Sequence, residues 1–120
     1  MNPEDTVLFK SKKFAIRIVR LFMYLRDKKG ETVMSGQLLR SGTSIGANMS
    51  EAECAVSKKD FANKVGIALK ECAETAFWLD LLHDTQFLSD AEFDGIMEDC
   101  VVIRKMLTAT TKTLKEDNSD

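Results

Sequence analysis

The chain contains few of the residues that interrupt helices. Its 120 residues include one proline, at position 3, and six glycines. A fold of many short strands needs far more turn residues, so this composition favours long helices. No apolar run approaches the ~18 residues of a membrane span, and the N-terminus lacks the basic start and apolar stretch of a secretory signal. We therefore expect a cytoplasmic protein built of long helices.

Histidine is almost absent, and this limits catalysis and metal binding. A di-iron helical bundle uses two Glu-x-x-His motifs, whereas this chain has one Asp80-x-x-His83 and no second copy. A Ser/His/Asp or Cys/His set would need the same histidine, for which we expect either a helix-terminal cation or a packed neutral ring. The segment 41–46 neither follows a strand nor ends in Gly-Lys, so it is no phosphate loop. We expect no enzyme, no catalytic residue, no metal and no cofactor.

Cysteine is also sparse. Cys54, Cys72 and Cys100 are odd in number, widely spaced and embedded in helical patterns. Without a secretory signal they are expected to be reduced thiols that serve mostly as small core residues. The alternative is a reactive cysteine.

The remaining composition suits one globular domain. Hydrophobic residues make up 44% and charged residues 30% of the chain. Residues 1–120 form one predicted domain, with 1–10 and 115–120 loosely ordered. Helices are predicted from a cap at Ser11 to 29, over 32–56, from a cap at Ser57 to 84, and after a capping box at 89–92. Short turns between them predict an all-α, up-down-up-down four-helix bundle.

The second predicted helix is the central one. Its apolar residues fall within about 60° of arc at 100° per residue. These are Met34, Leu38, Ile45, Met49, Ala52 and Val56. Gly42 and Gly46 each cost about 1 kcal/mol relative to alanine in a helix, so a compensating gain is needed. We expect that gain to be close packing against another helix.

A polar stripe lies beside this apolar one. It consists of Gln37, Arg40, Ser44, Asn48 and Glu51. Short polar groups next to a buried seam usually form hydrogen bonds between helices. The alternative is that Arg40 and Asn48 contact a ligand or nucleic acid.

Charge is unevenly distributed. Residues 1–40 carry nine Lys/Arg against four Asp/Glu, whereas residues 41–120 carry eight against fifteen. The first helix carries a basic stripe that consists of Lys13, Arg17, Arg20 and Lys28, and the aromatic Tyr24 lies between them. Such a stripe is either a solvated face or a set of phosphate contacts.

The third predicted helix has two partly apolar faces. One follows the core spacing, and the other mixes apolar residues with charges. The second face contains Ile67, Glu71, Glu74 and Trp78, together with Lys64. Either this helix is central in the bundle or this face is a subunit interface, where tryptophan is enriched.

Three motifs between residues 37 and 79 resemble those of a known family. They are Gln37-Leu38-Leu39-Arg40-Ser41-x-x-Ser44-Ile45-x-Ala47-Asn48-x-x-Glu51, Ser57-x-x-Asp60-Phe61 and Ile67-Ala68-x-x-Glu71-x-x-Glu74-x-x-x-Trp78-Leu79. The chain resembles, from Phe14 to about Leu114, the small helical proteins encoded in intervening sequences of bacterial 23S ribosomal RNA genes. The resemblance implies a four-helix bundle assembled as a homopentamer, without established catalytic residues. A related branch is the accessory protein of diversity-generating retroelements, a basic pentamer that binds nucleic acid and partners a reverse transcriptase. Unlike that branch, this chain is acidic overall, with a pI of about 5.5.

Two functions are compatible with these sequence patterns. The first is a nucleic-acid-associated oligomer that uses the basic stripe of the first helix on RNA or DNA. The second is an oligomeric scaffold or adaptor that binds a protein partner and no nucleic acid. The direction in which the basic stripe points would distinguish them.

Overall fold

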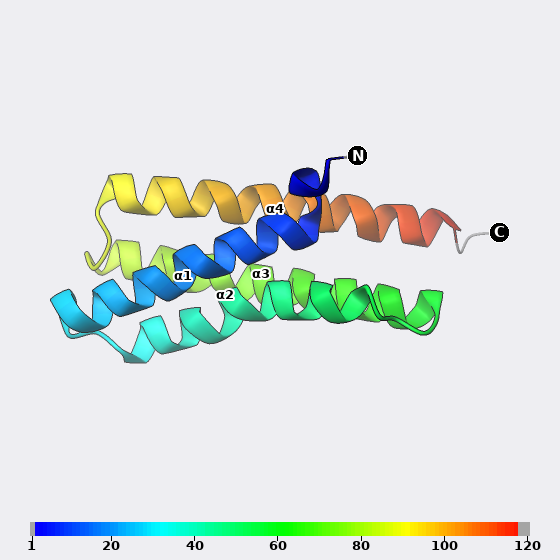
Figure 1. Ribbon diagram of the computed structural model, residues 1–120. Helices are drawn as coiled ribbons and strands as arrows, with labels where there is room; N and C mark the ends of the chain where they lie inside the picture. The colour runs from blue at the N-terminus through cyan, green and yellow to red at the C-terminus, as the bar shows by residue number, and fades with distance from the viewer. Residues whose placement is uncertain (1, 118–120) are drawn as a thin grey trace.

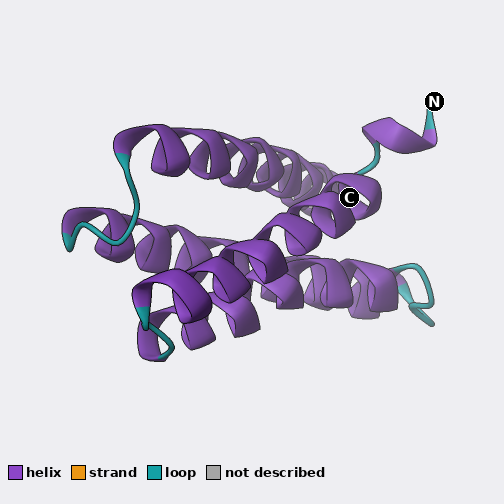
Figure 2. Cartoon of the chain, turned by 60° about the vertical axis from the view of Figure 1, so that its left-hand side comes forward, coloured by secondary structure: helices purple, strands orange, loops and turns teal. Residues whose placement is uncertain are grey.

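The computed structural model describes residues 2–117, and these form a four-helix bundle, as predicted (Figure 1). A short 3-10 helix, η1 (Pro3–Asp5), precedes α1 (Val7–Lys29), α2 (Val33–Ala52), α3 (Lys58–Asp84) and α4 (Asp90–Asp117). No strand occurs within this range. Consecutive helices run in opposite directions and are joined by short turns (Figures 1 and 2). Since α1 packs on α2 and α4 but not on α3, α1 and α3 lie diagonally across the bundle.

The start of α1 differs from the prediction. The helix begins at Val7 rather than after Ser11, and the predicted lead-in 1–10 contains its first turn. Thr6 is the cap, since its Oγ1 accepts a hydrogen bond of 3.1 Å from the Phe9 N–H. The early start lets Val7 and Leu8 pack against the core. Residues 118–120 of the predicted loose tail lie outside the described residues, and 115–117 continue α4.

Ser11, the expected cap, lies in the interior of α1 and is fully buried. Its Oγ has no hydrogen-bond partner among the described residues. A buried hydroxyl without a partner carries an uncompensated desolvation cost, and serine is a poorer helix former than alanine. Ser11→Ala is therefore expected to raise the free energy of unfolding by about 1 kcal/mol. Urea denaturation monitored by circular dichroism measures this, and a destabilised variant would contradict it.

The end of α2 also differs from the prediction. The helix stops at Ala52 rather than near Val56, whose side chain is 92% exposed. The cap of the next helix accounts for the early end. Ser57 Oγ accepts from the Asp60 N–H, and Asp60 Oδ2 accepts from the Val56 N–H at 3.2 Å. The backbone of Val56 thus serves the start of α3 and cannot continue α2.

The predicted apolar stripe of α2 is buried at Leu38, Ile45, Met49 and Ala52, half-buried at Met34 and exposed at Val56. Buried side chains come from all four helices: Phe14, Ile18, Leu25, Leu38, Ile45, Met49, Val65, Ala68, Leu79, Leu82, Ile96, Ile103 and Leu107. The capping box at the start of α4 is confirmed, because Ser89 and Glu92 exchange hydrogen bonds of 2.8 and 3.1 Å.

Close packing that requires a glycine is confirmed at Gly42 but not at Gly46. A Cβ on Gly42 would lie 2.9 Å from both Cγ1 and Cγ2 of Ile18. A Cβ on Gly46 would lie 3.5 Å from the backbone of Ser11, which is ordinary contact. The two helices therefore approach each other most closely where Gly42 faces Ile18, and less closely where Gly46 faces Ser11.

The three cysteines are free thiols in two different environments. Cys72 and Cys100 are buried, and their Sγ atoms are 3.7 Å apart between α3 and α4. The hydrogen bond with Cys72 and burial raise the pKa of the Cys100 thiol. These two fit the expected role as small core residues, whereas Cys54 is exposed in the turn after α2.

Candidate nucleic-acid interface

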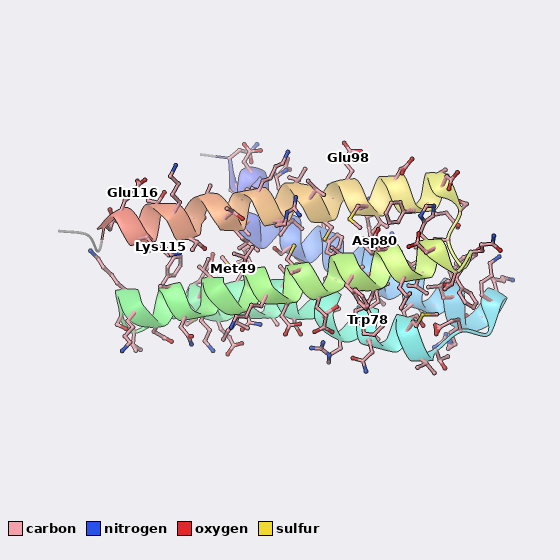
Figure 3. The ribbon with its side chains drawn as sticks, turned by 180° about the vertical axis from the view of Figure 1, so that it is seen from behind. Met49, Trp78, Asp80, Glu98, Lys115 and Glu116 are labelled. Carbon is pink, nitrogen blue, oxygen red and sulfur yellow. The ribbon has the colours of Figure 1, made fainter. Side chains whose placement is uncertain are left out.

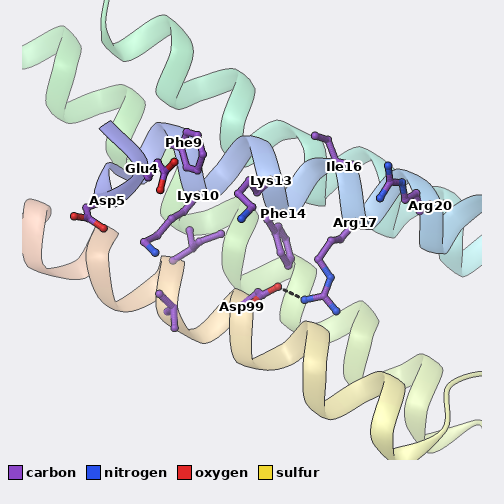
Figure 4. Close-up of a pocket in the computed structure, with 12 residues that line it drawn as sticks. Glu4, Asp5, Phe9, Lys10, Lys13, Phe14, Ile16, Arg17, Arg20 and Asp99 are labelled. Atoms are coloured by element: carbon purple, nitrogen blue, oxygen red, sulfur yellow. Dashed lines mark hydrogen bonds and ion pairs between the residues drawn. The ribbon is translucent and has the colours of Figure 1, made fainter. Parts of the chain in front are cut away.

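The basic side of α1 faces a groove between α1 and α4 (Figure 4). The groove has a volume of about 630 Å³. Apolar surface in the groove comes from Phe9, Phe14, Ile16, Val102 and Ile103. Four basic residues on α1 also line it: Lys10, Lys13, Arg17 and Arg20. We call these four residues the basic row. They occupy successive positions three or four residues apart, so they share one side of the helix.

Arg17 is the member of the basic row that α4 holds. Its Nη1 forms an ion pair with the Asp99 carboxylate and lies 3.5 Å from the Gly95 carbonyl oxygen (Figure 4). Both partners are about half exposed, so the pair contributes little stability. Its effect is to orient the guanidinium across the groove rather than along α1.

The structure brings together three of the four predicted nucleic-acid residues. Lys13, Arg17 and Arg20 line the groove, whereas Lys28 is not among its lining residues. Lys10 was missed because the sequence placed the start of the helix after it. With the helix starting at Val7, the interval of seven residues from Lys10 to Arg17 would have placed it in the row.

Opposite charges are present in the same groove. Glu4 and Asp5 of η1 and Asp99 of α4 line it beside the basic row. α1 as a whole is nevertheless strongly basic, with eight Lys/Arg and one Asp. The α1 wall of the groove is therefore basic, whereas η1 and α4 add three acidic groups to it.

The predicted polar stripe of α2 packs partly against α3. Arg40 reaches the carboxylates of Glu71, at 3.2 Å, and Glu74. At the other end of the stripe, Glu51 pairs with Lys64 at 3.2 Å. Arg40 therefore makes contacts between helices, as the first of the two interpretations expected.

Other members of the polar stripe stay within α2. Ser44 donates to the Arg40 carbonyl, and Asn48 donates to the Ser44 carbonyl. The side-chain oxygen of Gln37 accepts from Arg40 Nε at 3.4 Å. A buried hydrogen bond between α2 and α3 is made by Ser41, which is not a member of the polar stripe. Its Oγ lies 3.0 Å from Thr75 Oγ1.

The predicted subunit face of α3 is half-buried against this stripe. Trp78 Nε1 donates to Glu74 Oε2 at 2.9 Å, so Glu74 accepts from Trp78 and Arg40. These hydrogen bonds, that of Arg40 first, hold the pKa of the Glu74 carboxyl below its usual value. Glu71 and Ile67 are also half-buried. Figure 3 shows Trp78 at the edge of α3 that lies beside α2.

His83 packs against the start of α4. Its ring stacks on Phe93, with centroids 4.2 Å apart, and Nε2 lies 2.7 Å from Asp90 Oδ1. Asp80, three residues earlier, is exposed on α3. Among residues 2–117, no three His, Cys, Asp or Glu side chains are grouped to hold a metal ion. None of the helices in that range combines the length and apolar character needed to cross a bilayer.

Comparisons with known proteins identify the family. A family model described as 23S rRNA-intervening sequence protein matches residues 4–109. A similar solved structure is a protein of unknown function from the S23 ribosomal protein family of Bacteroides thetaiotaomicron. It is 48% identical, with a TM-score of 0.88 over 89% of this chain and 99% of that chain. No curated protein matches. The chain belongs to the family of 23S rRNA-intervening sequence proteins.

Proposed function

We propose that this protein is a non-enzymatic cytoplasmic homo-oligomer that associates with RNA or DNA through the basic row. The family resemblance implies five copies. The observation that carries the proposal is the basic row itself, which presents four cationic side chains on one wall of a groove. From Lys10 to Arg20 the helix rises about 15 Å, a length that spans four to five nucleotides of one strand at about 3.4 Å each.

Assembly would multiply a modest local charge. One groove is lined by four basic and three acidic side chains, so a single copy attracts a nucleic acid only weakly. Several copies in one assembly would bind a long polyanion together, and each bound site raises the effective concentration at the next. The proposal therefore needs the oligomer as well as the basic row.

The second candidate is a scaffold that binds a protein partner and no nucleic acid. The pairing of Arg17 with Asp99 favours it, because this guanidinium is partly neutralised within the chain. The acidic groups of η1 in the same groove act in the same direction.

Fluorescence anisotropy with a structured ribosomal RNA fragment and a DNA single strand distinguishes the two candidates. For the nucleic-acid function, log affinity is expected to fall linearly with log salt, by about 0.7 to 0.9 for each phosphate contacted. In Arg17→Gln/Arg20→Gln the slope is expected to fall by about one for each lost contact. Glutamine is chosen because it removes the charge without placing a new carboxylate beside Asp99.

The matched control is Lys58→Gln/Lys59→Gln, which makes the same change in net charge at the exposed start of α3. It is expected to bind as the wild-type protein does. Equal losses in both variants would show that only net charge matters, and the basic row would not be the site. Absence of wild-type binding at low salt, where screening is weakest, would leave the scaffold function.

A further inference from the structure

The outward side of α1 carries an uncovered apolar stripe. It consists of Phe9, Ile16, Val19 and Met23, which are 37, 43, 40 and 46% exposed. Their spacing of seven, three and four residues places them within about 80° of arc, opposite the buried side of the helix. We call these residues the outer stripe. Intervals of this kind form the seam between packed helices.

The charge of α1 limits what can cover the outer stripe. Lys12 lies within the arc of the outer stripe, and Lys13 and Arg20 flank it. The whole helix has eight basic residues and one acidic residue. Pairing two copies of α1 with each other would place like charges together, which is unfavourable at an interface. The surface that covers the outer stripe should therefore be apolar and acidic.

The chain has such a surface on its other side. Phe77 of α3 is 55% exposed, the most of any aromatic residue described, and its ring packs edge-on against Trp78. Ala73, Asp80 and Asp84 are exposed within about 60° of arc around it. Asp80 and Asp84 give this arc its negative charge, whereas Glu71 and Glu74 pair with Arg40 on another side of α3. The exposed Lys70 lies at the edge of the arc, three residues before Ala73. We call Ala73, Phe77, Asp80 and Asp84 the acidic face.

Other exposed apolar residues are weaker candidates. Val33 at the start of α2 and Val56 in the turn between α2 and α3 stand alone, and no helical stripe continues from them. The acidic first half of α4 has no large exposed apolar side chain beside it, because Val102 faces the groove with α1. The acidic face of α3 is therefore the surface of this chain that best matches the outer stripe in both polarity and charge.

The position of the two surfaces decides the kind of contact. α1 and α3 lie on a diagonal of the bundle, and their outward sides point in opposite directions (Figures 1 and 3). The outer stripe and the acidic face of one copy therefore cannot contact each other. In a two-fold dimer, the outer stripe of each copy could not reach the acidic face of the other copy at the same time. A contact between different surfaces on successive copies is heterologous, and it forms rings when its rotation closes.

We infer that the outer stripe of one copy packs against the acidic face of α3 in the next copy, head to tail. This inference rests on the proposed oligomer and names the surfaces that build it. The predicted subunit residue Trp78 would then support the contact from the side, through its packing against Phe77. The basic row lies next to the outer stripe on α1, so each contact would set one groove beside the seam between copies.

Two variants, each disabling one surface, test the inference. Ile16→Glu/Val19→Glu disrupts the outer stripe, and Phe77→Lys disrupts the acidic face. Because all three side chains are substantially exposed, melting temperatures close to that of the wild type are expected. Light scattering coupled to gel filtration should show an oligomeric wild type and a monomer for each variant. Val56→Glu, at an exposed site outside both surfaces, is the matched control and should keep the wild-type mass.

Mixing the two variants identifies the geometry. The Phe77→Lys chain keeps an intact outer stripe, and the Ile16→Glu/Val19→Glu chain keeps an intact acidic face. A head-to-tail contact therefore predicts a one-to-one dimer that grows no further. If outer stripes paired with each other, Phe77→Lys alone would dimerise, and the inference would be overturned.

The remaining outcomes separate this inference from the proposed function. An oligomeric wild type whose two variants keep its mass would overturn the two surfaces and leave the proposed oligomer standing. A mixture that stays monomeric would also overturn the pairing of these surfaces. A monomeric wild type would contradict the proposed oligomer and this contact together, whereas loss of nucleic-acid binding alone would not affect the contact.

Discussion

Replacing Gly42 with alanine is expected to lower the free energy of unfolding by about 1–3 kcal/mol. The added Cβ would lie 2.9 Å from Cγ1 and Cγ2 of Ile18, a residue with no exposed surface. These two carbons branch directly from the Ile18 Cβ, so no rotation of the far end of the side chain relieves the overlap. The gain of about 1 kcal/mol from the better helix propensity of alanine offsets only part of this cost. Urea denaturation of the two proteins measures the difference.

Gly36 provides the matched control for Gly42. It lies in the same helix, but a Cβ there would meet nothing within 4 Å. Gly36→Ala is therefore expected to stabilise the protein by up to about 1 kcal/mol. Ile18→Ala offers a second check, because the space that it opens should reduce the cost of Gly42→Ala, which a double-mutant cycle detects. Equal effects at Gly36 and Gly42 would contradict close packing at Gly42.

Replacing Glu31 with alanine is expected to cost about 2 kcal/mol, because its carboxylate caps α2. Glu31 Oε1 accepts from the Met34 N–H at 2.6 Å, and Oε2 accepts from the Ser35 N–H at 3.0 Å. Thr32, the residue adjacent to the helix, makes no side-chain cap bond. Both Glu31 and Ser35 are buried, so after the substitution water would not easily reach the released backbone N–H groups. The carboxylate also lies at the positive end of the helix dipole.

Glu31→Gln should fall between the wild type and Glu31→Ala, since the amide keeps one accepting oxygen. Glu53→Ala, at the exposed end of the same helix, removes the same type of side chain without removing a cap bond. It is expected to leave stability within about 0.5 kcal/mol of the wild type. Denaturation midpoints rank the four proteins, and a stable Glu31→Ala would show that α2 does not depend on this cap.

Features that depend on near neighbours in the chain could be read from the sequence. The four helices, the caps at Ser57 and Ser89 and the buried stripes follow from side-chain spacing at 3.6 residues per turn, and the structure confirms them. The basic side of α1 was also visible, because its residues share one helix face. The subunit interface and nucleic-acid binding stay predictions.

Boundaries were less predictable than helices. Ser11 and Thr6 are both good caps by type, and packing of Val7 and Leu8 on the core selected Thr6. That one difference removed Lys10 from the predicted basic stripe. At the C-terminal end of α2, Val56 continues the apolar spacing of the helix, but its N–H donates to the Asp60 side chain and not to a carbonyl of α2. Local pattern allows both outcomes in each case, and tertiary packing or the neighbouring cap selects one.

The sequence by itself determined that this chain forms four amphipathic helices with a basic first helix, because amphipathicity and charge are properties of each segment. Only the tertiary structure decided what faces each side chain. It opposed Gly42 to Ile18, joined Arg40 to Glu71 and Glu74, and left Phe77 exposed on the side opposite to α1. These outcomes depend on atoms more than twenty residues away along the chain, whose positions are set by how the helices pack.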